Sequence, residues 1–212
     1  ASGSEDLRLY ASHEQFPVAL SMFLRRVEAE HYTTHVMFVD THSINISEEA
    51  ELVASLYGVN ILPVAAGSPE EMAFVESRVR LLKRHSTAQM LGAPHLPASF
   101  WALSDKYAVY TRQFLPQSTR NFHCSFYLRT GRVINWRLTF IKNFGAPCRY
   151  VPGDGPVHKR GAVVKAGIFV GVQYPAVLVY REEEPKCVIS VSMKKVVVYE
   201  SQYLKELDEM VE

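Results

Sequence analysis

Residues 58–80 read GVNILPVAAGSPEEMAFVESRVR, and this stretch decides the fold. Its first part, residues 59–65, is short and apolar, which is typical of a strand. Its second part opens with Ser68, Pro69 and two glutamates, a sequence that caps a helix and starts it with proline. We therefore predict a strand followed by a long helix over residues 69–90.

Strands and helices also alternate upstream of this stretch. The sequence predicts a strand at 7–11, a helix around 16–27, a strand at 34–39 and a helix from Ser47 to Gly58. Residues 36–39 (VMFV) are apolar on both faces, which favours a strand buried in an α/β sheet, and Asp40 follows directly.

The sequence pattern changes in the second half of the chain. A helix opens at Pro97 and carries the aromatic residues Phe100, Trp101, Tyr107, Tyr110 and Phe114 at helical spacing, which favours a core or an interface over a base-stacking platform. After about residue 136 the pattern predicts short strands at 162–172, 176–180, 187–191 and 196–199. Such strands are typical of a small antiparallel barrel or sandwich, and residues 201–212 have helical spacing.

Composition and charge exclude several classes of protein. The chain has 212 residues, 48% apolar and 21% charged, so it can bury a core. We see no apolar run of the roughly 18–20 residues that a membrane span needs, so we expect no membrane contact. The formal net charge of +1 argues against strong sequence-independent binding of nucleic acid. Binding through a local basic patch is still compatible with it. The spacing of Cys124, Cys148 and Cys187 fits no zinc motif, and we interpret them as reduced thiols of an intracellular protein.

Five ordered motifs resemble copia-type retrotransposon integrases. Residues 58–80 resemble the pattern "GI…APYTPQQNGVAERKNR" without a gap, and 35 residues separate Asp40 from Glu76, the separation that retroviral and retrotransposon integrases use. The other matches are residues 96–102 to "LPxxFWAEA", 127–132 to "PYELWTGRKP", 144–151 to "FGCxAYV" and 167–171 to "GIFVGY".

The resemblance implies a fold and a domain order. We expect an RNase H-like integrase-core domain over residues 5–120, a connecting segment at 121–143, a small all-β barrel at 144–200 and a C-terminal helix at 201–212. In the family, two aspartates and a glutamate bind two Mg²⁺ or Mn²⁺ ions, which drive phosphodiester cleavage and strand transfer. Asp40 and Glu76 match the second aspartate and the glutamate.

The sequence departs from the family where the chemistry takes place. Counting back from the helix start at 12–14, the first aspartate would fall before residue 1. Residues 41–45 read THSIN where the family has NGGEF, and residues 70–73 read EEMA where it has QQNG. Two extra acids would repel a DNA phosphate, and Met-Ala lacks the freedom of glycine. We expect Asp40 and Glu76 to be vestigial, with residual metal binding as the alternative; His42 is left unassigned.

The long helix after Glu76 carries a basic set, Arg78, Arg80, Lys83 and Arg84. In integrases this helix lies along DNA, so phosphate contact is one interpretation and an ordinary solvated face is the other. A second, weaker candidate set consists of Lys194 and Lys195 with His158, Lys159 and Arg160, for which basic β-turns are the other interpretation.

These sequence features lead to three alternative hypotheses for the function. The first is a catalytically inactive integrase-like module that binds a protein partner or forms a homodimer, without a cofactor or a small-molecule substrate. The second is a nucleic-acid-binding module that uses the basic helix. The third is a metal-dependent integrase or nuclease whose first aspartate precedes residue 1. The resemblance also implies self-association and a nuclear location.

Overall fold

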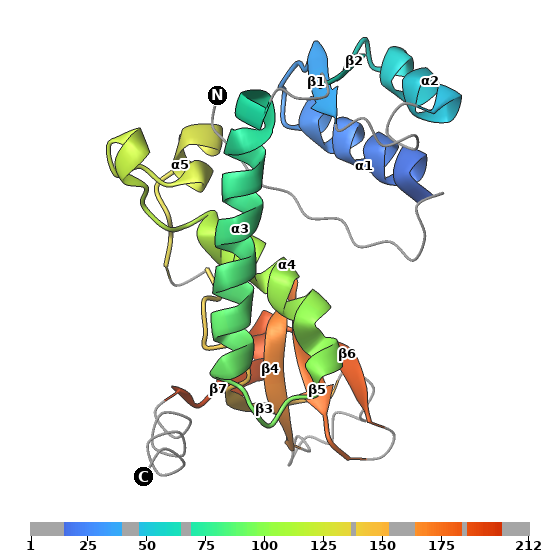
Figure 1. Ribbon diagram of the computed structural model, residues 1–212. Helices are drawn as coiled ribbons and strands as arrows, with labels where there is room; N and C mark the ends of the chain where they lie inside the picture. The colour runs from blue at the N-terminus through green and yellow to red at the C-terminus, as the bar shows by residue number, and fades with distance from the viewer. Residues whose placement is uncertain are drawn as a thin grey trace. The chain divides into compact units, whose positions relative to one another are not determined.

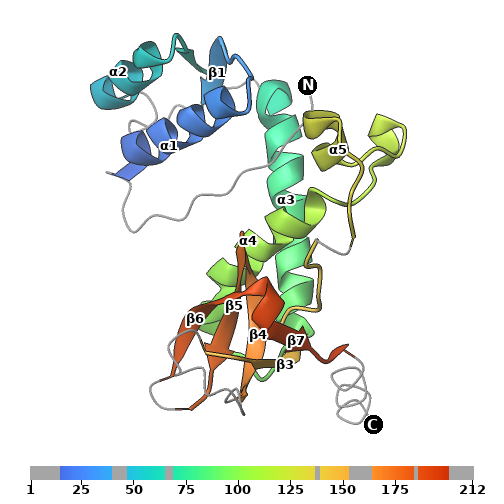
Figure 2. The same cartoon turned by 180° about the vertical axis from the view of Figure 1, so that it is seen from behind.

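The computed structural model describes residues 15–39, 47–64, 69–136, 139–152, 164–183 and 186–200. The described residues divide into two compact units, one within residues 15–79 and the other within residues 80–200 (Figures 1 and 2). We call them the N-terminal unit and the C-terminal unit. The predicted strand at 7–11 and the predicted helix at 201–212 lie outside the described residues, and the predicted domain boundaries stay predictions.

The N-terminal unit contains the alternating elements that the sequence predicts. They are α1 (Phe16–Ala29), β1 (Val36–Val39), α2 (Glu48–Leu56) and β2 (Asn60–Pro63). β1 and β2 pair in parallel, with Val36 opposite Asn60 and Val39 opposite Pro63. The predicted cap of α2 is confirmed, because the Ser47 hydroxyl accepts a hydrogen bond from the Ala50 N–H at 3.3 Å.

One face of the β1–β2 pair is covered and the other is exposed. Leu20 and Leu24 of α1 pack with Ala50 and Ala54 of α2, and Met37 lies against this cluster. Phe38 points to the opposite face because side chains alternate along a strand, and it is 64% exposed. Among the described residues of the N-terminal unit, the α1–α2 core covers one face of this strand only, so the predicted burial on both faces is wrong for this part of the chain.

α3 (Pro69–Leu91) is the predicted long helix, and the boundary between the two units falls inside it, after Val79. Its C-terminal half packs against α4 (Trp101–Arg112) through a buried polar contact. The Ser104 hydroxyl lies 3.0 Å from the Ser86 carbonyl oxygen and 2.9 Å from Gln89 Oε1. This contact satisfies a hydroxyl that is fully buried.

The C-terminal unit combines short helices with a five-stranded antiparallel sheet. The helices are η2 (Ala98–Phe100), α4, η3 (Ser118–Arg120), α5 (Ser125–Thr130) and η4 (Met193–Lys195). The strands are β3 (Pro147–Tyr150), β4 (Lys165–Gln173), β5 (Ala176–Arg181), β6 (Cys187–Ser192) and β7 (Val196–Val198), in the order β6-β5-β4-β3-β7. The predicted antiparallel strands are confirmed, but the described strands do not show the sheet closing into a barrel.

Aromatic packing joins α4 to the sheet. α4 crosses one face of the sheet, and Figure 2 shows the strands from the other side. The Tyr107 ring lies 5.2 Å from Phe169 of β4 and 6.1 Å from Phe144, measured between ring centroids. The aromatic residues of this helix are predicted to form core or an interface, and Tyr107 and Phe114 are buried whereas Trp101 is exposed.

A tight contact positions the start of β3. Gly145 has φ +84°, and a Cβ atom there would collide with the Cβ of Ala93. The His95 ring donates a hydrogen bond from Nε2 to the Gly145 carbonyl oxygen at 2.9 Å. Only glycine therefore fits at this position, where the turn before α4 meets the turn before β3.

Candidate functional site

The predicted carboxylate site is described only in part. Glu76 lies on α3 with an exposed side chain, whereas Asp40 and His42 lie outside the described residues. Within the described ranges, no group of three or more His, Cys, Asp or Glu side chains could hold a metal ion. The vestigial role of Asp40 and Glu76 stays a prediction.

The basic set on α3 is divided between two sides of the helix. Arg80, Lys83 and Arg84 are exposed, and their spacing places them on the same side as Glu76. Arg78 is half-buried and lies on the other side of the helix, in line with Leu82, Ser86 and Gln89. Three of the four predicted residues are therefore brought together on one exposed surface. Lys194 and Lys195 of the weaker set are exposed on η4, whereas His158, Lys159 and Arg160 lie outside the described residues.

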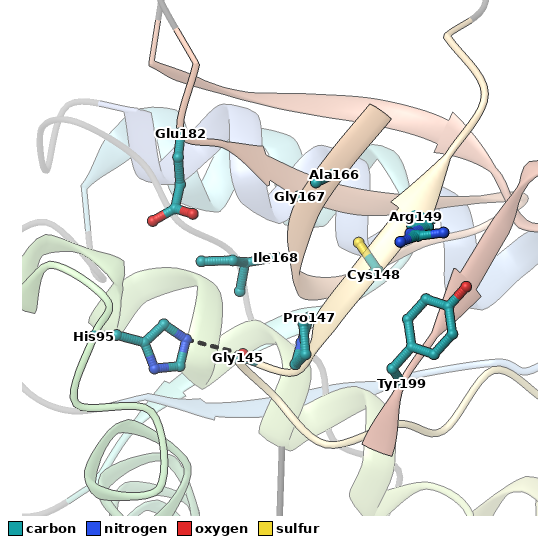
Figure 3. A pocket seen from close by; sticks show the side chains of 10 residues that line it. All are labelled: His95, Gly145, Pro147, Cys148, Arg149, Ala166, Gly167, Ile168, Glu182 and Tyr199. Carbon is teal, nitrogen blue, oxygen red and sulfur yellow. Dashed lines mark hydrogen bonds between the residues drawn. The ribbon is translucent and has the colours of Figure 1, made fainter. Parts of the chain in front are cut away.

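A pocket of about 600 Å³ opens beside β3 and β4 in the C-terminal unit (Figure 3). His95 and Glu182 lie on one side of it, and Arg149 and Tyr199 lie on the other. The Arg149 guanidinium carbon is 5.9 Å from the centroid of the Tyr199 ring, a cation–π distance. The pocket therefore presents one cation and one carboxylate on opposite sides.

The pocket holds no activated nucleophile among its lining residues. Burial raises the pKa of the Cys148 thiol to about 12, so this thiol is protonated at neutral pH. The His95 Nε2–H bonds to a backbone carbonyl. This arrangement favours packing of the turn over acid–base chemistry.

Charge is segregated along the chain in a way that the net charge hides. Residues 106–153 contain eight Lys and Arg residues and no Asp or Glu, whereas residues 27–77 contain nine Asp and Glu and no Lys or Arg. The two runs nearly cancel in the total of +1. Counting charge in windows rather than over the whole chain would have found them.

The basic run contains a compact stretch of chain between α4 and the sheet, residues 113–136. We call it the 113–136 segment. The Phe126 N–H donates to the Gln113 carbonyl oxygen at 2.9 Å, and Pro116 forms a β-bridge with Cys124. The Arg120 guanidinium donates to the Ser125 hydroxyl at 2.6 Å. Large apolar side chains of this segment are nevertheless exposed: Leu115, Phe122, Tyr127, Leu128, Val133 and Trp136.

Phe122 is the most unusual residue of the 113–136 segment. It has φ +61°, follows Asn121 at φ +49°, and its side chain is 74% exposed. A left-handed backbone costs a non-glycine residue about 1–2 kcal/mol. An aromatic residue held there in solvent is a candidate for a binding role.

The acidic run contains a second exposed surface on α2. Glu48, Glu49 and Glu51 are exposed in its first turn, and Leu52 and Leu56 are exposed one turn apart. We call these five side chains the α2 face. Ala50 and Ala54 on the opposite side of the helix are buried, so the α2 face is its solvent side.

Comparison with known structures identifies the fold. A chain in the cryo-EM structure of the simian T-cell lymphotropic virus intasome, in complex with PP2A regulatory subunit B56 gamma, is similar to this chain with a TM-score of 0.50. The match covers 93% of this chain and 68% of that chain at 14% identity. The fold is therefore integrase-like and resembles RNase H. Comparisons with protein-family models and with curated protein sequences find no match. No helix in the described part of the chain is long and apolar enough to cross a membrane.

Proposed function

We propose that the chain is a catalytically inactive integrase-like module, of copia-type descent, that serves as a protein-interaction scaffold. The observation that carries this proposal is the exposure of large apolar side chains on two surfaces of opposite charge, the α2 face and the 113–136 segment. Aromatic and arginine side chains together are typical of protein interfaces. We also propose that the five-stranded sheet closes into a small barrel, as the resemblance to copia-type integrases implies.

The loss of catalysis is supported by the sequence around the two remaining carboxylates. Residues 41–45 and 70–73 differ from the family's catalytic segments, and the second of these gains two glutamates. Carboxylates in the path of a DNA phosphate oppose its approach. We infer that Asp40 and Glu76 do not form a working two-metal site.

A DNA-processing assay tests the proposed loss of activity. Labelled duplex DNA is incubated with the protein in Mg²⁺ or Mn²⁺, beside a Glu76→Gln variant of equal folded content by circular dichroism. We expect no nicking or strand transfer above the level of the variant. Metal-dependent cleavage that Glu76→Gln abolishes would overturn the proposal and support the active enzyme.

A second candidate, nucleic-acid binding, is favoured by the exposed side of α3 that carries Arg80, Lys83 and Arg84. Fluorescence anisotropy of labelled DNA and RNA at about 50 and 200 mM salt measures it, because phosphate contacts weaken steeply with salt. Micromolar or tighter binding that Arg80→Glu with Arg84→Glu abolishes would establish this candidate. Arg25→Glu with Lys186→Glu is the matched control, since it removes the same charge from two exposed residues that lie outside both candidate basic sets.

A further inference from the structure

We propose that the α2 face of one copy of this chain docks on the 113–136 segment of a second copy. This inference rests on the proposed function and names the partner as the chain itself. The contact is head-to-tail, because the two surfaces come from different parts of each copy.

Charge complementarity is the first argument. The α2 face carries three glutamates within a run of 51 residues, 27–77, that has no Lys or Arg. The 113–136 segment carries Arg120, Arg129 and Arg132 within a run of 48 residues, 106–153, that has no Asp or Glu. Opposite potentials of this kind steer two surfaces together and exclude partners of like charge.

Apolar exposure is the second argument. Leu56 is 75% exposed on the α2 face, and Phe122 is 74% exposed on the 113–136 segment. Each side chain is therefore uncovered by the rest of its own unit. Burial of apolar area on docking would supply the main free-energy gain, with the charged residues at the rim.

Rigidity of the 113–136 segment is the third argument. The Gln113–Phe126 hydrogen bond and the Pro116–Cys124 bridge close the segment, and the Phe114 and Phe126 rings pack at 5.5 Å. Arg129 Nη2 also lies 3.4 Å from Gln113 Oε1. A segment fixed in this way loses little conformational entropy when it binds.

The apolar residues favour a protein occupant over nucleic acid. Leu115, Leu128 and Val133 are aliphatic, and aliphatic side chains cannot stack on bases as aromatic ones do. The two leucines of the α2 face offer a matching apolar stripe. Nucleic acid is therefore treated as an outcome of the test.

Sedimentation velocity over a concentration series of the full chain tests the proposal. Two variants each remove one surface: Glu48→Lys with Glu51→Lys on the α2 face, and Phe122→Ala with Arg132→Glu on the 113–136 segment. We expect the unmodified chain to associate as concentration rises, and each variant to weaken association by about tenfold or more. Lys194→Glu with Lys195→Glu is the control and should leave association unchanged.

Mixing the two variants gives the decisive result. Each variant keeps the surface that the other has lost, so an equimolar mixture should form mixed pairs at concentrations at which each variant alone stays monomeric. Circular dichroism of each variant establishes that it is folded. A mixture that stays monomeric while the unmodified chain associates would overturn the head-to-tail contact.

Two further outcomes also overturn the proposal. One is an unmodified chain that is monomeric at every concentration. The other is binding of labelled single-stranded RNA or DNA to the unmodified chain that only the Phe122→Ala, Arg132→Glu variant loses. That result would show that the 113–136 segment binds nucleic acid. Neither outcome touches the proposed loss of catalysis, which the Glu76→Gln comparison tests separately.

Discussion

The hydroxyl of Tyr107 donates a hydrogen bond to the Lys142 carbonyl oxygen at 2.6 Å and accepts one from the Lys142 N–H at 2.7 Å. Burial raises the pKa of Tyr107 well above its usual value, so the hydroxyl remains protonated and able to donate. One side chain of α4 thus satisfies both polar groups of a backbone position that precedes β3. The pair fixes the approach of the chain to the sheet.

Removing this hydroxyl should destabilise the C-terminal unit. Tyr107→Phe leaves a donor and an acceptor of Lys142 without their partner, and we expect a loss of about 2 kcal/mol in the free energy of unfolding. Urea denaturation measures it. Tyr174→Phe, which removes a hydroxyl from an exposed ring, should cost almost nothing, and equal losses in the two variants would contradict the assigned role.

A pair of glycine variants separates backbone strain from collision. Gly131 and Gly145 both have positive φ, but a Cβ at Gly131 meets nothing within 4 Å, whereas one at Gly145 collides with Ala93. We expect Gly131→Ala to cost about 1 kcal/mol and Gly145→Ala about 3 kcal/mol, because overpacking adds to the strain. Thermal unfolding of both variants checks this. Indistinguishable melting temperatures would mean that the Ala93 contact relaxes freely.

The three thiols should differ in reactivity. Cys124 and Cys148 are buried, Cys187 is partly exposed, and all three are free. Under native conditions at about pH 8, a thiol reagent should label Cys187 quickly and the other two only after denaturation, since the thiolate is the reactive form. Cys187→Ser should abolish the fast phase. Fast labelling of Cys148 would contradict the burial of its thiol.

Acid should destabilise the fold through His85. Burial lowers the pKa of His85 below its ordinary value of 6.5, and the nearby Arg112 acts in the same direction. As pH falls through 6.5 the unfolded chain binds the proton first, so the free energy of unfolding decreases with falling pH. His85→Gln should flatten this dependence between about pH 7 and 5. A slope that stays the same in His85→Gln would contradict this role of His85.

Local patterns predict the elements that have strong local signals. The cap at Ser47 and the Ser68-Pro69 start predict α2 and α3, and alternating apolar runs predict β4 to β7. α5 was not predicted because its six residues make fewer than two helical turns, too few for a period to show. β3 was not predicted because its four residues do not form an apolar run like residues 36–39. β3 also contains Pro147 and Arg149, and pairing with β4 and β7 rather than its own sequence makes it a strand.

The candidate site was less accessible to sequence reasoning. The basic set on α3 was found, but its division between two sides of the helix requires knowing which stripe is buried. The 113–136 segment was missed because its charge is cancelled by the acidic run elsewhere in the total of +1. Its exposed Phe122 follows from a left-handed backbone that no apolar pattern encodes.

The left-handed conformation of Phe122 sets two kinds of selection against each other. A library of substitutions at this position screened for folding alone should enrich glycine and asparagine, which adopt that conformation at little cost. The same library screened for self-association should keep the aromatic ring. Position 122 would then be one where the residue best for the isolated chain and the residue best for the assembly differ.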